Sequence, residues 1–393
     1  MKIFLYPNQP LIKYRGKYFV KFKNFIDFFI ELSKLNEAYC LVIPCKVMKE
    51  LPKEKLIQLD LPHDKVIEIN YENSKFIKFI KVSFRNVFYI RSRIIFELSR
   101  NEKVIFAGSG PDFFLILLLL LLPRAVDFAF FMRGDKLATV RYYYKKSPLY
   151  PFIISLIKVF NWRIYHLINQ SRAKVFLFGE KLREEYSKFN LASYVIASLI
   201  DKSWIRKDKR PVIPEGRPLK VLFVGRLSPE KNIFSLLEAC KLSIEKKQPF
   251  TLSIIGCGPL EIKIREWIKK FKLSDYIKFM GYIPHGVELI KEYDSHDLLC
   301  LPSYTEGIPR TVVEAFAREM PVLATPVGSL PTIFPKEIKF LNGFSAEKIF
   351  QGIKWCNNHR MELSLMGIEG QRIIHSFVIQ ENAVKVDKIL REM

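Results

Sequence analysis

The sequence has few cysteines, and their spacing argues against the common metal and disulfide frameworks. Its 393 residues include six cysteines, which form no C-x-x-C pair and lie mostly within apolar stretches. Such thiols are typical of buried, reduced side chains in a cytosolic protein. We therefore expect neither a zinc site nor a disulfide framework, and no other metal site is indicated.

Apolar runs long enough to cross a bilayer are also lacking. The stretch MKIFLYPNQP has four apolar residues before Pro7, which are too few for a signal peptide. Phe113 to Leu122 is a run of ten apolar residues closed by Pro123 and Arg124, whereas a bilayer span needs about 20. We interpret this run as a buried core helix. A helix that dips its apolar face into one leaflet and a re-entrant segment are the alternatives.

Acidic residues are scarce relative to basic ones. The chain has 63 Lys/Arg and 40 Asp/Glu, a formal net charge of +23, and its first 200 residues hold 33 Lys/Arg against 17 Asp/Glu. This excess favours a polyanion or an anionic membrane surface as a partner, and a lysine-rich but merely solvated surface is the alternative. The basic residues do not gather with aromatic ones in a recognisable nucleic-acid-binding module, so we expect no nucleic-acid partner.

Short apolar runs alternate with longer amphipathic ones, a pattern that predicts α/β domains with parallel sheets. The length indicates two domains, and the alternation restarts at LKVLFVG, from Leu219. Residues 201–218 carry three prolines and six Lys/Arg with little periodicity, which is typical of a linker. Two doubly wound sheets joined in this way would leave a cleft at the carboxyl ends of their strands.

The segment VLFVGRLSPEKNIFSLLEA suits a diphosphate site. A strand ends at Gly225, and Ser228 and Pro229 are typical of a helix start. Arg226 and Lys231 then place two cations beside a helix N-terminus, where anions bind. A capped surface helix with unrelated charges is the alternative.

The segment IIGCGPLE resembles a dinucleotide-binding turn, because Gly256 and Gly258 follow a strand and precede a helix. The third glycine of G-x-G-x-x-G is missing, which argues against a dehydrogenase. The segment could line a cleft or could be only a tight turn.

The segment SYTEGIPRTVVEAFA joins a buried strand to a helix that we predict to begin at Pro309, with Ile308 at the N-cap. Isoleucine cannot cap a helix, so a bound anion could satisfy the exposed N–H groups. Glu306 would lie in the loop, and Glu314 one and a half turns into the helix. Each carboxylate could accept hydrogen bonds from hydroxyls of an extended ligand. Two solvated glutamates are the alternative.

In this order and spacing the segments resemble glycosyltransferase family 4, the large retaining family of glycosyl transferases group 1. The matching residues are VGRLSPEKN, IIGCGPLE, PVLATPVGSLPTIF and the E-x7-E signature from Glu306 to Glu314. The resemblance is strongest from Leu219 to about Phe334. It is weaker over residues 1–200, where FGEKLREEYSKF and VIASLID resemble the end of the N-terminal domain of the family.

The resemblance implies the GT-B fold, with two Rossmann-like, doubly wound α/β domains that face each other across a cleft. Residues 1–200 would bind the acceptor, 201–218 would be the linker, 219–377 would bind the nucleotide sugar, and 378–393 would form a helix that returns to the N-terminal domain. By the same resemblance, Arg226 and Lys231 would bind the diphosphate near Gly225 and Gly256. Glu306 would contact the sugar hydroxyls, and Glu314 would hold the ribose. The N–H groups of Gly307 and Ile308, before Pro309, would bind sugar and phosphate.

The N-terminal half departs from the common family pattern. Many members place a histidine after one of its strands, whereas AVDFAFFMRGDK offers Asp135 at the matching position. Asp135 would orient donor or acceptor, or would belong to a surface turn. The glycine-rich loop that commonly follows the first strand is absent as well.

We therefore expect a metal-independent, cofactor-free, retaining glycosyltransferase that moves a sugar from a nucleoside diphosphate to a glycan acceptor. The acceptor would be lipid-linked and the product a cell-surface polysaccharide, and the protein would lie in the cytoplasm against the anionic inner face of the membrane. A catalytically silent nucleotide-sugar-binding or scaffold protein on the same fold is the alternative.

Overall fold

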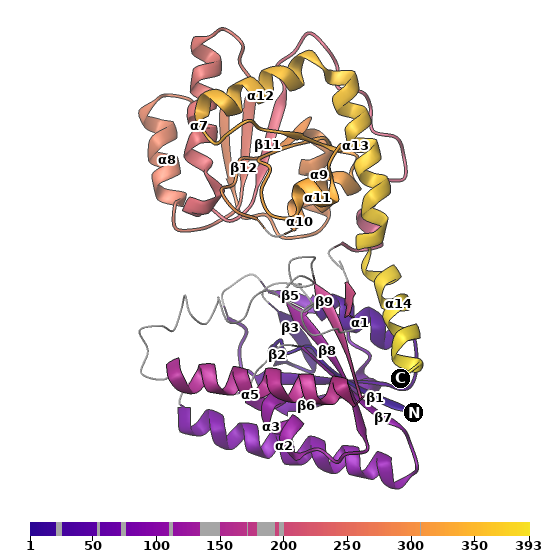
Figure 1. Cartoon of the computed structure of the whole chain (residues 1–393). Helices are drawn as coiled ribbons and strands as arrows, with labels where there is room; N and C mark the ends of the chain where they lie inside the picture. The colour runs from indigo at the N-terminus through magenta and orange to yellow at the C-terminus, as the bar shows by residue number, and fades with distance from the viewer. Residues whose placement is uncertain are drawn as a thin grey trace. The chain divides into compact units, whose positions relative to one another are not determined.

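The computed structural model describes the chain apart from residues 21–25, 53–55, 72–75, 110–112, 134–149, 171, 179–192, 196–199 and 307. Two compact units are present (Figure 1). The N-terminal unit comprises Met1–Ser198 and Ile379–Met393, and the C-terminal unit comprises Leu199–Val378.

The C-terminal unit has a parallel six-stranded sheet of order β13-β12-β11-β14-β15-β16. This is the order of a doubly wound Rossmann sheet, with the switch point between β11 and β14. Its strands are β11 (Lys220–Val224), β12 (Thr251–Ile255), β13 (Ile277–Gly281), β14 (Leu298–Leu301), β15 (Val322–Ala324) and β16 (Ile338–Phe340).

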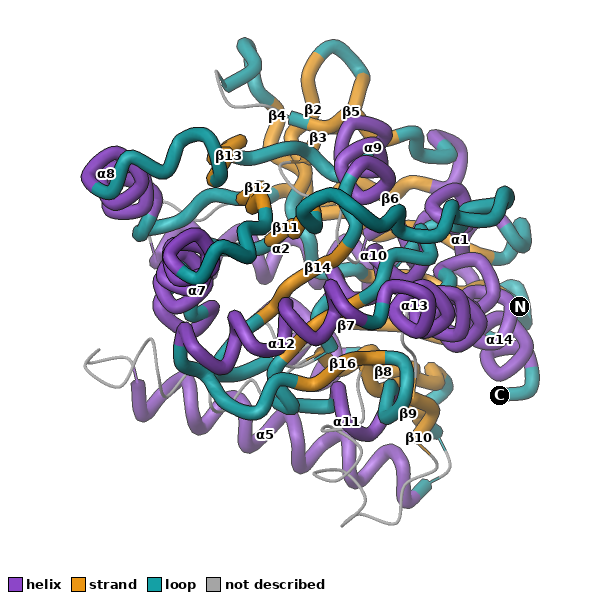
Figure 2. Tube along the Cα trace, turned by 90° about the horizontal axis from the view of Figure 1, so that it is seen from above, coloured by secondary structure: helices purple, strands orange, loops and turns teal. Residues whose placement is uncertain are grey.

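Helices cover both faces of this sheet. Figure 2 shows α7, α8 and α12 on one side and α9, α10 and α13 on the other. The strands are almost wholly buried because apolar side chains project from both faces into these layers. The helices are α7 (Ile233–Glu245), α8 (Glu261–Lys270), α9 (Val287–Ser295), α10 (Arg310–Ala317), α11 (Leu330–Ile333), α12 (Ala346–Asn358) and α13 (Arg360–Ile374).

The N-terminal unit is built on a ten-stranded sheet of order β10-β9-β8-β7-β1-β4-β2-β3-β5, in which β6 also pairs with β4. All pairs are parallel except β2 with β3 and β3 with β5. The strands are β1 (Lys2–Tyr6), β2 (Leu11–Tyr14), β3 (Lys17–Val20), β4 (Tyr39–Val47), β5 (Ile57–Leu59), β6 (Val66–Asn70), β7 (Val104–Ser109), β8 (Val126–Arg133), β9 (Ala173–Phe178) and β10 (Ser193–Val195).

The antiparallel hairpin of β2 and β3 occupies the region where a glycine-rich loop would follow the first strand. Its two turn residues, Arg15 and Gly16, have φ angles of 47° and 77°. Positive φ at both central positions is typical of the type I′ turn that matches the twist of paired strands.

Two helical layers enclose the N-terminal sheet. Helices α2 (Phe76–Ser99), α3 (Phe113–Leu121) and α5 (Tyr150–Asn169) cover one face, and α1 (Ile26–Lys34) and α14 (Ile379–Arg391) cover the other. The apolar run from Phe113 to Leu122 is thus confirmed as a core helix, because Leu115 and Leu118 are fully buried. Among the described residues, no helix is both long and apolar enough to span a bilayer.

The predicted linker, residues 201–218, is attached to the C-terminal unit. Trp204 and Ile213 are buried, and the Arg210 guanidinium donates to the backbone oxygens of Tyr293, His296 and Arg318. Burial lowers the pKa of Arg210 to about 10, so the group stays protonated near neutrality.

The cysteines are free thiols, but not all of them are buried as expected. Cys45, Cys240, Cys300 and Cys356 are buried, whereas Cys40 is half-buried and Cys257 is exposed. Burial raises the pKa of Cys240 to about 12. Cys257 differs because the backbone, and not its side chain, fills the space between the loops that follow β11 and β12.

The last helix, α14, is part of the N-terminal core although it lies at the opposite end of the sequence from the first strand. Val386 and Leu390 are buried against α1, and the Tyr39 hydroxyl donates to Asp387 Oδ1 at 2.7 Å. The structure thus closes the N-terminal unit with the C-terminal end of the chain.

We therefore predict that Leu390→Ala destabilises the N-terminal unit by about 2–5 kcal/mol, the cost of removing a buried leucine side chain. Val384→Ala, at a site 56% exposed on the same helix, should change stability by less than about 0.5 kcal/mol. Hydrogen exchange measured by mass spectrometry would report on peptides of α1 and β4 separately from the other unit. Equal protection in the two variants would contradict the assignment of α14 to this core.

Candidate functional site

The carboxyl edge of the C-terminal sheet brings together residues from two separate loops. Gly225 and Arg226 follow β11, and the 3-10 turn Pro229–Lys231 follows them. Glu306 lies in the loop after β14, the strand that pairs with β11 at the switch point. Tyr304 N–H donates to the Glu230 carbonyl oxygen at 2.8 Å, which ties the two loops together.

Lys231 and Glu306 form the central contact of this edge. Lys231 Nζ donates to Glu306 Oε1 at 2.7 Å and to Oε2 at 2.8 Å. The Lys231 side chain is 19% exposed and that of Glu306 is 7% exposed. The predicted phosphate-binding cation and the predicted sugar-binding carboxylate are thus brought together, and they neutralise each other.

Two hydroxyls fix the loop that carries Glu306. Ser303 Oγ donates to Glu306 Oε1 at 2.7 Å, and Thr325 Oγ1, after β15, donates to the Ser303 carbonyl oxygen at 2.5 Å. Ser303 and Thr325 are fully buried. Neither residue was predicted from the sequence, although a serine three positions before Glu306 was a usable signal.

Asn232 is a third residue of this edge that was not predicted from the sequence. Its φ of 54° lies in the left-handed region, which asparagine tolerates better than most residues. Its side-chain amide donates to the carbonyl oxygens of Pro302 and Phe344, at 3.2 and 2.8 Å. Asn232 therefore anchors the end of the Lys231 turn to the loop that leads to Glu306.

Arg226 is exposed at the same edge. No hydrogen bond or ion pair of its side chain is present within the described ranges. The nearby Glu230 accepts a hydrogen bond from Ser228 Oγ at 2.5 Å, and this bond is the main cause that holds the pKa of Glu230 below its ordinary value. Arg226 is thus the accessible cation of the edge, and Lys231 is the paired one.

Gly256 packs against the loop after β11. A Cβ at Gly256 would lie 1.9 Å from the Gly225 carbonyl oxygen, and one at Gly258 would lie 2.5 Å from that of Leu227. Leu227 N–H donates to the Cys257 carbonyl oxygen at 3.0 Å, so the two loops continue the strand pairing. Both glycines permit backbone contact between these loops, which is a structural reason for the Gly-Cys-Gly segment.

Helix α10 begins one residue later than predicted. Pro309 is its N-cap, with extended backbone angles, and Arg310 is its first residue, so the prediction of Ile308 as N-cap and Pro309 as first residue is wrong. Proline satisfies the φ of a cap but has no side-chain acceptor, and no side chain caps this helix. The prediction for Gly307 lies outside the described residues.

Glu314 is buried on α10, away from Lys231. Its Oε2 accepts a hydrogen bond from the Tyr293 hydroxyl at 2.8 Å, and its Oε1 lies 3.0 Å from Arg310 Nε. Burial, together with the charge of Glu314, raises the pKa of Tyr293 above its ordinary value, so the phenol remains a donor. In this structure Glu314 joins α9 to α10 instead of ending in a solvent-filled site.

Asp135, the predicted residue of the N-terminal half, lies outside the described residues. The N-terminal unit does contain a cavity of about 130 Å³ at the carboxyl ends of β1, β4 and β6. Tyr6, Asn70 and Asn86 are among its lining residues, and Asn86 Nδ2 donates to the Asn70 carbonyl oxygen at 2.7 Å.

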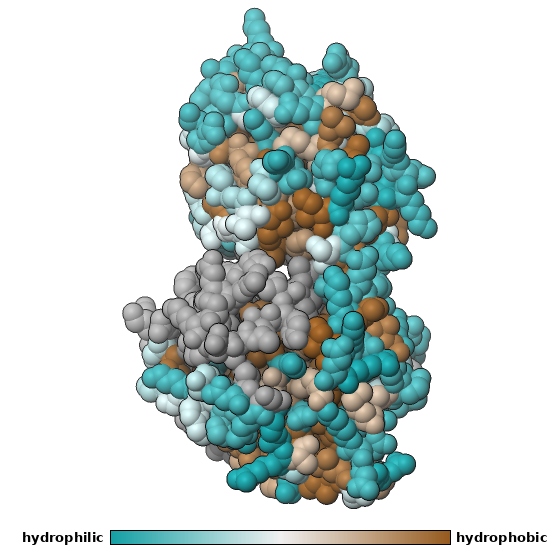
Figure 3. Space-filling view, turned by 45° about the vertical axis from the view of Figure 1, so that its right-hand side comes forward, coloured by the Kyte–Doolittle hydropathy of each residue, from teal (hydrophilic) through white to brown (hydrophobic). Residues whose placement is uncertain are grey.

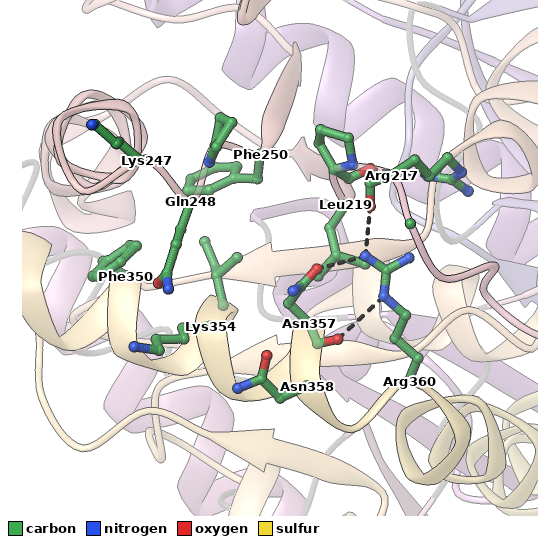
Figure 4. A pocket seen from close by; sticks show the side chains of 14 residues that line it. Arg217, Leu219, Lys247, Gln248, Phe250, Phe350, Lys354, Asn357, Asn358 and Arg360 are labelled. Atoms are coloured by element: carbon green, nitrogen blue, oxygen red, sulfur yellow. Dashed lines mark hydrogen bonds between the residues drawn. The ribbon is translucent and has the colours of Figure 1, made fainter.

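A larger cavity, of about 350 Å³, lies at the opposite edge of the C-terminal sheet, where β11 and β12 begin (Figure 4). Arg360 reaches across it and donates to the carbonyl oxygen of Arg217 at 2.6 Å and to Asn357 Oδ1 at 2.5 Å. Lys247 follows the end of α7, where a cation offsets the partial negative charge of the helix C-terminus. Lys354 lies in α12, before its last turn. None of the predicted site residues lines this cavity.

Comparison with known proteins identifies the segment that carries the candidate site. Residues 205–353 match the family described as Glycosyl transferases group 1. The match covers less than half of the chain. The matched segment contains the Lys231–Glu306 contact, the Rossmann switch point and the uncapped start of α10.

Among curated proteins, the chain is 33% identical over 135 residues to the putative colanic acid biosynthesis glycosyltransferase WcaL of Escherichia coli (strain K12). The alignment covers 33% of each protein, so the likeness spans about a third of that relative.

Solved structures resemble the whole chain. Sucrose-phosphate synthase from Thermosynechococcus elongatus aligns with a TM-score of 0.66 at 15% identity, covering 100% of this chain and 99% of that one. Anabaena Alr3699/HepE in complex with UDP aligns with a TM-score of 0.64 at 13% identity, with full coverage of both chains. At this identity the likeness concerns the fold, which is the α/β GT-B fold with two Rossmann-like units.

We predict that Lys231→Met lowers the free energy of unfolding of the C-terminal unit by about 1–3 kcal/mol, because among the described residues Glu306 then keeps only Ser303 as a hydrogen-bond partner. Adding Glu306→Gln to Lys231→Met should restore much of the lost stability, because a neutral amide costs less to bury without a cationic partner than a carboxylate does. Denaturant unfolding of the single and double variants would give a coupling energy of about 0.5–3 kcal/mol.

The matched control is the exposed pair of Arg372 and Glu369, whose side chains are 72% and 51% exposed. Arg372→Met should cost less than about 0.5 kcal/mol. A coupling energy near zero for Lys231 and Glu306 would show that their contact does not organise the edge.

Proposed function

We propose that the protein is a retaining, metal-independent glycosyltransferase that transfers a sugar from a nucleoside diphosphate to a lipid-linked glycan. The observation that carries this proposal is the Lys231–Glu306 contact at the Rossmann switch point, beside the accessible cation of Arg226. It lies within the segment that matches Glycosyl transferases group 1. Ligands of open parallel sheets bind at this edge.

In the proposed complex, the donor diphosphate approaches Arg226 and the uncapped start of α10. Lys231 then lies between the diphosphate and Glu306, where its ammonium group donates charge-assisted hydrogen bonds to both anions. The two cations stabilise the negative charge that develops on the leaving diphosphate, which is the main electrostatic demand of the reaction. Neither step requires a bound metal or a covalent protein nucleophile.

Glu306 is the residue proposed to contact the sugar. Ser303 and Lys231 fix both of its oxygens, so its remaining lone pairs have a defined direction toward the sugar hydroxyls. A carboxylate held in this way needs little reorganisation when the donor binds. For Glu314 to hold the ribose, as the resemblance implies, a ribose hydroxyl would have to reach a carboxylate that is only 3% exposed and already accepts a hydrogen bond from Tyr293.

The acceptor side is proposed to be the N-terminal unit, with Asp135 orienting donor or acceptor. The cavity of about 130 Å³ at the carboxyl ends of β1, β4 and β6 supports a ligand role for this unit. Because the aligned relative is described as a putative colanic acid biosynthesis glycosyltransferase, we propose a cell-surface polysaccharide as the product. The protein would work in the cytoplasm at the anionic inner face of the membrane.

A catalytically silent protein that binds nucleotide sugars is the second candidate. It is favoured by one observation, the mutual neutralisation of Lys231 and Glu306, which leaves Arg226 as the accessible cation of the edge. Donor binding without hydrolysis or transfer, across a panel of lipid-linked acceptors, would support this candidate.

We predict that a nucleoside diphosphate raises the midpoint of thermal unfolding, since a ligand of the native state stabilises it by mass action. UDP is the first compound to test, because it is bound in the Anabaena Alr3699/HepE structure, followed by GDP and ADP. At a concentration of 100 times the dissociation constant, the stabilisation should be about 2.7 kcal/mol.

Arg226→Ala should weaken nucleotide binding at least tenfold, because it removes an accessible, charge-assisted donor. Arg372→Ala removes an exposed cation elsewhere in the same unit and should leave the affinity unchanged. If neither UDP, GDP, ADP nor their sugar conjugates shifted the midpoint, the donor site would be disproved at this edge.

A further inference from the structure

The helices α2, α3 and α5 expose an unusual number of large apolar side chains on the side that faces away from the sheet. Phe88 and Phe96 are each 56% exposed, and Trp162 is 62% exposed. Figure 3 shows apolar atoms reaching the surface at the lower end of the N-terminal unit, where α2 lies in Figure 1. We call the following residues the α2–α5 face: Phe84, Phe88, Tyr89, Ile95, Phe96, Leu120, Leu121, Val159, Trp162 and Tyr165.

These side chains form a layer distinct from the core. The buried residues of the same helices, such as Val87, Ile94 and Ile164, pack on the sheet. Helix α3 contacts both α2 and α5, so the three outer surfaces adjoin one another. Helix α2 has 24 residues, which corresponds to a length of about 36 Å. Single exposed apolar residues are ordinary, but a contiguous group across three helices indicates a binding surface.

The charges of this layer have one sign. The sequences of α2, α3 and α5 contain seven Lys/Arg residues, and Glu97 is their only acidic residue. Arg85, Arg93 and Lys158 are exposed beside the aromatic residues. The Arg93 guanidinium lies over the Tyr89 ring at 5.7 Å. Basic groups therefore alternate with aromatic ones along the exposed surface.

We propose that the α2–α5 face binds the surface of an anionic lipid bilayer. Tryptophan, tyrosine and phenylalanine favour the boundary between lipid headgroups and acyl chains, and arginine and lysine bind the anionic headgroups. The near absence of acidic residues disfavours a partner of mixed charge, such as most protein surfaces. This inference rests on the proposed function, in which the acceptor is lipid-linked. It adds the surface of the protein that contacts the membrane in which such an acceptor lies.

The structure also revises which segment contacts lipid. The apolar run from Phe113 to Leu122 is mostly core, and only Leu120 and Leu121 at its end are more than a third exposed. We therefore assign membrane contact mainly to α2 and α5, and α3 contributes two leucines, Leu120 and Leu121. The protein would lie on one leaflet without crossing it.

The experiment is flotation of the purified full-length protein with vesicles of phosphatidylcholine alone or with one quarter phosphatidylglycerol, at 150 mM salt. The vesicles contain no glycan and no nucleotide. We expect binding to the anionic vesicles only. Phe88→Ser with Trp162→Ser should reduce the partition coefficient at least tenfold. Arg85→Gln with Arg93→Gln should reduce it roughly 30-fold, since each cation near an anionic leaflet contributes about a factor of five.

The control variant is Ile262→Ser with Met361→Ser, which removes two equally exposed apolar side chains from the C-terminal unit. It should float like the unaltered protein, and circular dichroism should verify that every variant is folded. Failure of the unaltered protein to bind anionic vesicles, or equal loss in the control variant, would overturn the proposal.

Other occupants of the face give different results. Self-association in size-exclusion chromatography with light scattering that the Phe88/Trp162 variant abolishes would assign the face to a second copy of the chain, and a salt-sensitive shift with random RNA would assign it to nucleic acid. Either result without vesicle binding would overturn the proposal. Vesicle binding with no stabilisation by any nucleotide would disprove the proposed donor site and leave the membrane surface standing.

Discussion

The pairing of β11 with β14 determines which side chains can meet at the carboxyl edge of the C-terminal sheet. These strands are separated by more than 70 residues, yet their carboxyl ends are neighbours because the chain crosses over between β13 and β14. The loop after β11 therefore delivers Lys231, and the loop after β14 delivers Glu306, to one place. A sheet with strands in sequence order would separate them.

The surroundings of this contact explain why it can form without a ligand. A nearly buried carboxylate would lose much of its hydration, and Lys231 and Ser303 replace that hydration with charge-assisted hydrogen bonds. The side chains of Asn232 and Thr325 donate hydrogen bonds to backbone oxygens of the loop that carries Glu306. The conformation of this loop therefore does not depend on the charged groups alone. The edge is thus ordered in advance, with Arg226 exposed beside it.

The sequence predicted the features that depend on local pattern. The buried strands of both units, the core helix at Phe113 and the restart of the α/β alternation at Leu219 all follow from runs of apolar residues, and the structure contains each of them. The N-cap of α10 was misplaced by one residue because proline fits both the cap and the first helical position. The environment of Glu314 was not predictable, since its partner Tyr293 lies 21 residues away on another helix. Pair contacts of this kind require knowledge of how helices pack.

The exposed aromatic residues of α2 are another feature that could not be predicted from the sequence. In sequence, the 24 residues of this helix alternate apolar and basic side chains so densely that every apolar residue could belong to a core. The sheet can cover only one side of a helix, so Val87 and Ile94 are buried while Phe88 and Phe96 remain at the surface. A helix that is apolar on more than the side it buries needs a second apolar environment. Because arginines lie next to these phenylalanines, the environment that suits this surface is apolar inside and anionic at its boundary. The surface of an anionic bilayer has both properties.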